Sequence, residues 1–559
     1  MANFRVDYAE TALLTLFCLL FLYTGIGSPW AHTIRHDFPY GYGASDAFFH
    51  QSVTEYMKEQ GRVKYTPPYE VGGYDNVYDA HPPILFQIAA PVSIMTGIET
   101  YDTVLFTAVF LLLLGALVMY CIIRVHSTSV ALLALPVTLL MLGGKSLIAL
   151  KWGYWLFIAG VFFMLAAFWM LSKRDVKHSW VLLGLLLGAT AVAHIPEFVF
   201  LGIFMALMLL WEVYKHKKLP IATLKTFIIA GVLAVILAAL SINLFIATFA
   251  KTEGYRGVTD TQLGSTGMTL IDLGWVGFII AGGAILFILS RKKNSMPAEI
   301  AIFLFVMSYL NLIGLGKRAA THRWFWYIYL AFFFGFAVYF ALSFIKKEWR
   351  TYVVLGASLL LMAGFSYAVY VPSEKQGPGV MDPYNWEAFT WIQKNIPEDA
   401  QIFYWYGDAL QQGAVLYNTR RVGYKINPEY IGSAVEKKRV ERVYAFGLAD
   451  SYAAYLCDAT PFSYGYYTVN PKTDNATCTK GSSGITPSVP YERDICDNEY
   501  HYFNAQSSQS QFSQYGLIVR QALLEGNMSE EIYRNDLVSI IKLKQTGVDC
   551  IGNITLSTA

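Results

Sequence analysis

Residues 31–83, AHTIRHDFPYGYGASDAFFHQSVTEYMKEQGRVKYTPPYEVGGYDNVYDAHPP, form the first long polar stretch of the chain and separate two apolar segments. The side chains in this stretch that are suited to chemistry are Asp46, His50, Asp75, Asp79 and His81. Ser45 is a suitable cap for a short helix on which positions 46 and 50 share one face, while the apolar positions 49, 53 and 57 share another. The stretch therefore predicts a polar loop at a membrane surface that carries a carboxylate and an imidazole one helical turn apart.

The chain around this loop is too apolar for a soluble enzyme of several domains. Of its 559 residues, 55% are hydrophobic and 15% are charged, and the mean hydropathy is +0.40. Apolar runs of about 20 residues, the length that crosses a bilayer, alternate with short polar loops up to residue 371. We therefore expect a polytopic α-helical membrane protein. The net charge of +2 and the scatter of Lys and Arg over the loops predict no nucleic-acid partner.

The loop charges predict a topology. Residues 11–30 are expected to be a retained first span, and residues 84–98 are short for a span and contain Gln87 and Pro91. If 84–98 stays on the side of the first loop, about eleven spans result and every second connection is basic. The basic connections are Arg124 and residues 172–178, 214–218, 291–293 and 346–350. The positive-inside rule then places them and the N-terminus in the cytoplasm, and places the first loop and the C-terminal part outside.

A change of composition near residue 371 predicts two domains. Residues 1–371 form the transmembrane domain with the external loop 31–83, and residues 372–559 form an extracytoplasmic α/β domain with a Cys-containing insert. Helices are expected at 386–395 and 409–417 and strands at 401–406 and 421–425, while residues 530–554 suggest a helix, a Gly turn and a final strand. Four cysteines of this part fit two disulfides in an oxidising compartment, with a zinc site as the rival interpretation: Cys457, Cys478, Cys496 and Cys550. Cys18 and Cys121 lie in apolar spans and are expected to be inert.

Four external segments could converge on one site: the first loop, residues 194–197, residues 251–268 and residues 317–323. A transfer site at a membrane face needs a base for the acceptor and cations for a departing phosphate. Asp46 is the candidate base or metal ligand, and Arg318 and Arg323 are the candidate phosphate clamp. The alternatives remain open: Asp46 as a helix cap, the arginines as headgroup anchors, and His194 with Glu197 as a mutual hydrogen bond that caps two spans.

This layout resembles the GT-C superfamily of lipid-linked-sugar glycosyltransferases, and within it the catalytic subunit of oligosaccharyltransferase. The first-loop segment SDAFFHQ (45–51) is similar to the acid followed by aromatic residues and His in that subunit. WIQKNIPEDAQIFYWYGDAL (391–410) and NTRRVGYKINPEYI (418–431) resemble the start of its C-terminal domain, and Arg323 before Trp324 resembles its Arg before a late span. The pattern is degenerate at Trp405-Tyr406-Gly407, where the family has WWDYG.

The resemblance implies an inverting glycosyltransferase that uses a polyprenyl-phosphate or diphosphate donor and a protein or glycolipid acceptor. The predicted catalytic residues are Asp46, His50 and Glu253, and the predicted substrate-binding residues are His81, Arg318, His322, Arg323, Trp405 and Tyr406. The family places a second acid-bearing motif in its second external loop, but GGKSLIALKWG (143–153) has no carboxylate. Whether Asp46 holds a divalent cation such as Mg or Mn therefore stays open, since other GT-C enzymes use this Asp as a base without a metal.

Two further classes of function stay open. A catalytically silent relative would anchor or assemble an external structure and use its Tyr-rich C-terminal part for binding. A transporter could use His194 and Glu197 as part of a proton path, although no paired interrupted helices or repeat are visible in the sequence.

Overall fold

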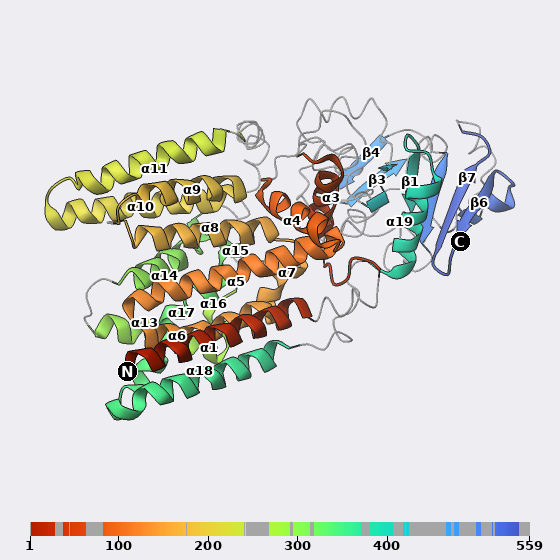
Figure 1. The fold of residues 1–559 in the computed structure, drawn as a ribbon. Helices are drawn as coiled ribbons and strands as arrows, with labels where there is room; N and C mark the ends of the chain where they lie inside the picture. The colour runs from red at the N-terminus through yellow and green to blue at the C-terminus, as the bar shows by residue number, and fades with distance from the viewer. Residues whose placement is uncertain are drawn as a thin grey trace.

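The computed structural model shows a bundle of helices followed along the chain by a β-sheet (Figure 1). It describes residues 2–27, 37–43, 45–62, 82–174, 176–239, 241, 268–290, 295–313, 318–370, 381–405, 418–419, 421–423, 466–470, 475–479, 499–504, 517, 520–521 and 523–546.

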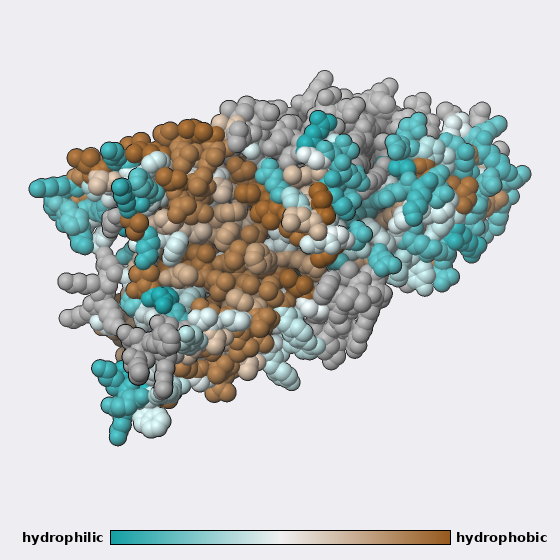
Figure 2. All heavy atoms as spheres, in the orientation of Figure 1, coloured by the Kyte–Doolittle hydropathy of each residue, from teal (hydrophilic) through white to brown (hydrophobic). Residues whose placement is uncertain are grey.

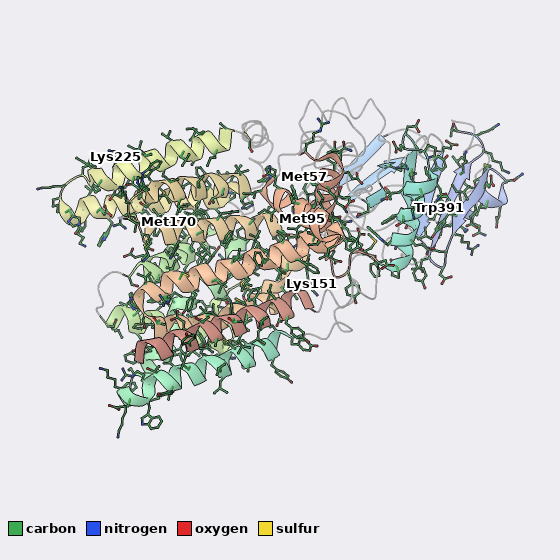
Figure 3. All side chains as sticks on the ribbon, in the orientation of Figure 1. Met57, Met95, Lys151, Met170, Lys225 and Trp391 are labelled. Atoms are coloured by element: carbon green, nitrogen blue, oxygen red, sulfur yellow. The ribbon has the colours of Figure 1, made fainter. Side chains whose placement is uncertain are left out.

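The first part of the bundle contains α1 (Ala2–Leu22) with η1 (Tyr23–Gly27), α3 (Ser45–Gln60), α4 (Ile84–Thr96), α5 (Thr100–His126), α6 (Thr128–Ala134), η2 (Leu135–Leu142), η3 (Gly144–Leu147), α7 (Ile148–Lys151), α8 (Trp155–Leu171), α9 (Ser179–Ala193), α10 (Ile195–His216) and α11 (Ile221–Ala239). The second part contains η4 (Leu270–Leu273), α13 (Trp275–Leu289), α14 (Met296–Met307), η5 (Leu310–Ile313), α15 (Arg318–Thr321), η6 (His322–Phe325), α16 (Trp326–Tyr329), α17 (Ala331–Leu342) and α18 (Lys347–Val369). Figure 3 labels Met57 on α3, Met95 on α4 and Lys151 on α7, all at the end of the bundle nearest the sheet, which we call the sheet end.

Six described helices are long and apolar enough to cross a membrane: Tyr8–Gly27, Thr100–His126, Ile195–His216, Ile221–Ala239, His322–Leu342 and Lys347–Val369. The segments Thr128–Leu142 and Gly144–Lys151 meet the same criterion together, but they bend by 61° at the break between them. Hydrophobic residues cover the middle of the bundle in Figure 2, and hydrophilic ones lie over its far end and over the sheet. The chain is an integral membrane protein, as predicted.

Five shorter helices are also apolar: Ile84–Thr96, Trp155–Leu171, Ser179–Ala193, Trp275–Leu289 and Met296–Met307. The first of them, α4, contains Pro91 and packs against α3 and α5 at the sheet end. Its residues Val92, Ile94 and Met95 are exposed, which is typical of a helix that meets lipid on one side. The segment 84–98 is thus short for a span, in line with the sequence analysis.

α5 is the most enclosed of the six long helices. Two thirds of its apolar window is buried, against about a fifth for α1 and α11, because it packs against α4, α6 and α8. Its apolar side chains point in every direction around the helix, so it can be buried on all sides. α8, which begins at the sheet end, packs along α5 and therefore has a fixed position in the bundle.

The sheet has the order β2-β1-β5-β7-β6, from β1 (Gln401–Trp405), β2 (Val422–Gly423), β5 (Tyr500–Asn504), β6 (Ser529–Arg534) and β7 (Val538–Leu543). β1 is parallel to β2 and β5, and β7 is antiparallel to β5 and β6. α19 (Pro383–Asn395) contacts the sheet, and Asp382 caps its N-terminus, where its carboxylate accepts from the backbone N–H of Asn385 at 2.9 Å. A separate antiparallel pair joins β3 (Tyr466–Asn470) and β4 (Asn475–Thr479).

The expected helix at the start of 530–554 is wrong, because this segment forms the hairpin of β6 and β7. The side chain of Asn535 accepts hydrogen bonds from the backbone N–H groups of Leu537 and Val538, which closes the turn between the strands. The expected helix 409–417 lies outside the described residues. So do three of the four cysteines, and for Cys478 only the backbone in β4 is described, so the predicted disulfides stay predictions.

Candidate functional site

Asp46 lies in the first turn of α3, at the sheet end of the bundle. Its side chain is exposed, whereas the next four residues, 47–50, are buried against neighbouring helices. The N–H groups and dipole of a helix N-terminus stabilise negative charge, so this position favours an ionised carboxylate. The acid therefore lies at the solvent side of a helix whose other side is fixed in the bundle.

His50 fixes α3 to the start of α8. Its Nε2 donates to the carbonyl oxygen of Gly153 at 2.7 Å, and only 4% of the residue is exposed. The imidazole also packs against the rings of Phe86 and Trp155. These contacts hold the helix that carries Asp46, and they leave the catalytic role predicted for His50 untested.

The second polar loop, residues 143–153, lies directly against the N-terminus of α3. The backbone N–H of Gly43 donates to the carbonyl oxygen of Lys151 at 2.7 Å. Gly153 has a φ of +82°, and a Cβ there would lie 2.4 Å from the backbone nitrogen of Ala47. Only glycine suits both the left-handed conformation and the close approach. The residues that this loop brings next to the start of α3 are therefore Lys151 and Trp152, and neither is an acid.

Arg323 is a buried cation in the short helix η6, and 7% of it is exposed. Its Nε donates to the carbonyl oxygen of Ser308 at 3.0 Å, and its Nη2 donates to Oδ1 of Asn311 at 2.9 Å. The guanidinium carbon lies 4.1 Å from the centre of the Tyr309 ring. Within the described part of the chain, no carboxylate pairs with this guanidinium. Arg323 is thus held in place by neutral groups.

A second buried charge lies at the start of α10. Glu197 is fully buried and accepts a hydrogen bond from Nδ1 of His194, so the mutual hydrogen bond considered from the sequence is present. Its other oxygen, Oε1, lies 2.9 Å from Nε2 of His322, the residue before Arg323. Nδ1 of His322 lies 3.2 Å from the hydroxyl oxygen of Tyr329. One carboxylate therefore joins the turn between α9 and α10 to η6.

The start of α8 connects the Asp46 region with the Arg323 region. The ring of Tyr154, next to Gly153, meets the ring of Trp324 edge-on with 4.8 Å between centroids. One turn further along α8, the ring of Phe157 lies 4.7 Å from that of His322. η3 of the second loop also contacts η6. Both regions thus pack on one short, rigid stretch of the bundle.

The residues that follow the 251–268 segment contact the second polar loop. Nζ of Lys145 lies 2.6 Å from Oδ1 of Asp272, and the backbone N–H and hydroxyl of Thr269 donate to Oδ2 of the same carboxylate at 2.7 and 2.8 Å. The hydrogen bond from Lys145, followed by those from Thr269, lowers the pKa of Asp272 to about 2. The loop residues 251–267 lie outside the described part of the chain.

Comparison with known proteins identifies the architecture. No family model and no curated protein matches the sequence. Among solved structures, the oligosaccharyltransferase AglB from Archaeoglobus fulgidus, in complex with an inhibitory peptide and a dolichol-phosphate, aligns with 96% of this chain and 88% of its own length, at 13% identity and a TM-score of 0.57. ArnT from Cupriavidus metallidurans, bound to undecaprenyl phosphate, aligns with 95% of this chain and 98% of its own length, at 9% identity and a TM-score of 0.55. The chain has a GT-C-like fold. The resemblance stated from the sequence is confirmed at this level.

In this GT-C-like chain, the predicted site residues that the structure describes fall into two groups, apart from Trp405. Asp46 and His50 lie with the second loop, and His322 and Arg323 lie with Glu197 and Ser308. For Arg318 only the backbone of α15 is described, and His81, Glu253 and Tyr406 lie outside the described residues. Trp405 is buried in β1, where its Nε1 donates to Nδ1 of His501 at 3.1 Å, and its predicted contact with substrate is untested.

The GT-C-like chain also uses residues that sequence reasoning missed. Gly153 was noted only as part of a loop without carboxylates, and Tyr154, Ser308, Tyr309 and Asn311 were not singled out. A Gly before two large rings and an Asn in an apolar span are weak signals that could have drawn attention to them. Among the described residues, no group of three His, Cys, Asp or Glu side chains is arranged to hold a metal ion.

Proposed function

We propose that this chain is an inverting glycosyltransferase. It moves a sugar or oligosaccharide from a polyprenyl-phosphate or diphosphate donor to a protein or glycolipid acceptor. The single observation that carries the proposal is the buried guanidinium of Arg323, which has neutral partners only in the described part of the chain. A buried charge is costly unless a counter-charge accompanies it, so this arrangement suits an anionic ligand.

A phosphate is the anion that Arg323 suits best. The planar guanidinium can donate two parallel hydrogen bonds to a phosphate, and its contacts with Ser308 and Asn311 already fix its orientation. The solved complexes with related folds contain dolichol-phosphate in AglB and undecaprenyl phosphate in ArnT. Arg318 is proposed as a second cation at this phosphate, and Glu253, His81, His322, Trp405 and Tyr406 remain proposed site residues.

The reaction would use Asp46 as the base. Its carboxylate accepts the proton from the acceptor's hydroxyl or amide, and the acceptor atom attacks the anomeric carbon from the face opposite the phosphate. The bond between that carbon and the phosphate oxygen breaks with its electron pair on the oxygen, where Arg323 stabilises the charge. Configuration at the sugar is inverted because one displacement occurs.

The proposed topology places the sheet end outside. The six long apolar helices, the bent pair and the four shorter apolar helices other than α4 would make eleven crossings. The N-terminus would then be cytoplasmic, residues 1–371 would form the membrane domain with loop 31–83, and residues 372–559 would form an extracytoplasmic α/β domain.

The test is transfer from a polyprenyl-diphosphate-linked sugar by the purified protein, with Asp46→Asn as the decisive variant. The amide has the shape of the acid but cannot take the proton, so transfer should fall by about a hundredfold or more. Asp536→Asn, at an exposed turn of the sheet, is the matched control and should keep full activity. Unchanged transfer in Asp46→Asn would show that the central assignment is wrong.

A second candidate is a catalytically silent relative that binds lipid-linked sugar without transferring it. The observation that favours it is the second loop, which brings Lys151 and Trp152 to the start of α3 where the related family carries an acid. The same assay separates the two, because this candidate predicts donor binding with no transfer by the natural protein.

A further inference from the structure

The proposed mechanism gives no role to Glu197, the most deeply buried acid of the described residues. Glu197 is fully buried in the membrane part of the bundle, at the start of α10. An ionised group at that depth is expensive to bury, and an apolar side chain of similar size would cost less. Its two histidine partners come from different segments of the chain, His194 beside it and His322 at the start of η6.

The neighbours of Glu197 leave it little room to move. A Cβ on Gly160 of α8 would lie 2.6 Å from Cβ of His194 and 2.9 Å from Oε2 of Glu197. Pro196 in the first turn of α10 sets the backbone just before the acid. The position of the carboxylate is therefore determined by the backbone of two helices.

His322 is enclosed by neighbouring side chains, although its approach to Glu197 is a close N···O contact without hydrogen-bond geometry. Glu197 lies at Nε2 and Tyr329 at Nδ1, while the rings of Phe157 and Phe200 each pack at 4.7 Å from the imidazole. His322 and Arg323 are consecutive residues of one tight 3₁₀ turn, in which side chains diverge by about 120°. Fixing His322 therefore fixes the backbone from which Arg323 extends toward Ser308 and Asn311.

We propose that Glu197 is a positioning residue, which acts through His322 to hold Arg323 in the orientation that binds the phosphate of the lipid-linked donor. The inference rests on the proposed function, since it names the group that prepares Arg323 for that phosphate. Glu197 touches neither donor nor acceptor. Glu197 keeps η6 rigid before the donor binds, so donor binding does not have to include the entropic cost of ordering η6.

The test measures binding of farnesyl phosphate to the purified full chain in detergent micelles, with farnesol as the phosphate-free probe. The ratio of the two dissociation constants reports recognition of the phosphate alone. In Glu197→Ala this ratio should fall by about threefold to thirtyfold, with a smaller loss in Glu197→Gln, whose side chain can still bond to one histidine. Gly160→Ala should give a loss as well, because the added methyl group displaces Glu197 without removing a polar atom.

Two controls separate positioning from general loss of packing. Glu10 is another buried acid, which bonds to Tyr120 and Arg124 of α5, so Glu10→Ala should lower the melting temperature but leave the phosphate ratio unchanged. Gly188→Ala in α9 adds a methyl group 3.1 Å from the side chain of Leu237 and should also leave the ratio unchanged. If the ratio of the two dissociation constants falls as much in either control as in Glu197→Ala, the role of Glu197 is packing and the inference is overturned.

Arg323→Ala distinguishes this inference from the function on which it rests. If Arg323→Ala abolishes the preference for farnesyl phosphate while Glu197→Ala and Gly160→Ala keep it, only the positioning role is wrong. If Arg323→Ala keeps the preference, the phosphate does not bind at Arg323, and the proposed function fails with the inference.

Discussion

Arg323 and Glu197 are both charged side chains inside the bundle, but their surroundings differ in kind. Glu197 has an imidazole nitrogen beside each carboxylate oxygen, Nδ1 of His194 at one and Nε2 of His322 at the other, so its polar neighbours all come from the protein. Arg323 has a carbonyl, an amide and a ring, which orient a guanidinium without neutralising it. The polar neighbours of Glu197 are titratable rings of the protein, whereas those of Arg323 are neutral groups. This difference suits Arg323, and not Glu197, to an external ion.

Replacing Arg323 with Lys tests whether geometry or charge matters there. Lysine keeps the charge but loses the planar fork and most of the contact with Tyr309. We expect the KM for the lipid-linked donor to rise by about tenfold with a smaller change in kcat, as measured by steady-state transfer over a range of donor concentrations.

Arg350→Lys is the matched control for that experiment. Arg350 also donates to backbone carbonyls, those of Ser343 and Ile345, near the start of α18. Its replacement should leave the donor KM unchanged. A donor KM in Arg323→Lys that equals that of the natural protein would contradict the phosphate assignment.

The sequence is enough to select individual residues by their type and local setting. It does not predict which distant residues they contact. Asp46 and Arg323 could be selected because an acid in a polar loop and a cation at a span end have recognisable chemistry. The hydrogen bond between His194 and Glu197 could also be foreseen, because the two are three residues apart. The contact of Glu197 with His322 could not, because the two residues are far apart in the sequence and meet where both segments pack on Phe157 of α8.

Among the elements, the turn before α8 determines how the site is assembled. The carbonyl oxygens of Gly153 and Lys151 accept hydrogen bonds from His50 of α3 and from Gly43 just before it. The ring of the next residue, Tyr154, packs against Trp324 of η6. The sequence analysis did not reveal this, because the pattern of apolar residues carries no sign of the 61° bend between η2 and η3. The bend brings residues 144–153 back along the sheet end.

Gly153→Ala should therefore displace α3 and Asp46. The methyl group would collide with the backbone nitrogen of Ala47, and the left-handed backbone would add strain of about 1 to 2 kcal/mol. Gly97→Ala is the matched control, because Gly97 has a φ of +71° but no described atom lies within 4 Å of the place that its added methyl group would take. We expect transfer to be lost in Gly153→Ala and kept in Gly97→Ala, with similar lipid binding in both; equal transfer in the two variants would contradict the docking of α3 on this turn.

The anchor at Asp272 predicts a pH dependence. Its folded pKa of about 2 lies below the ordinary 3.8, so the carboxylate stabilises the fold at neutral pH, and this stabilisation is lost as the pH falls through 3.8 toward 2. The Lys145 side chain is 60% exposed, so the effect should be about 1 kcal/mol or less. The difference in melting temperature between the natural protein and Asp272→Asn should stay constant from about pH 7 to pH 5 and shrink below about pH 4. A difference that vanishes near neutral pH would contradict this ion pair.

For the molecule as a whole, the helical bundle holds the two candidate regions at the end nearest the sheet. Hydropathy predicted the membrane class and the degenerate motifs predicted the GT-C-like fold, because both depend on local composition. The order of the sheet strands could not be predicted, since β1 pairs with β5 far along the chain. The hairpin of β6 and β7 was taken for a helix because its charged residues hid the alternation of a strand.

A metal site at Asp46 would depend on the whole molecule, because further ligands would have to come from distant segments. The second loop brings Lys151 and Trp152 to the start of α3, and neither is a carboxylate. We expect transfer to continue in EDTA at more than about half the untreated rate, as measured before and after addition of Mg²⁺ or Mn²⁺. Complete loss in EDTA with recovery on adding a divalent ion would show that segments outside the described residues complete a metal site.

The docking of α3 on the second loop through backbone groups has a consequence for how much the sequence can vary there. The bond between Gly43 and Lys151 joins an N–H to a carbonyl, which every amino acid except proline can reproduce. Side chains at 151 and 152 can therefore change in charge and size while the acid of α3 keeps its place, whereas the next position, Gly153, requires glycine. New chemistry beside Asp46, including a second carboxylate, could be introduced at those two positions without rebuilding the scaffold.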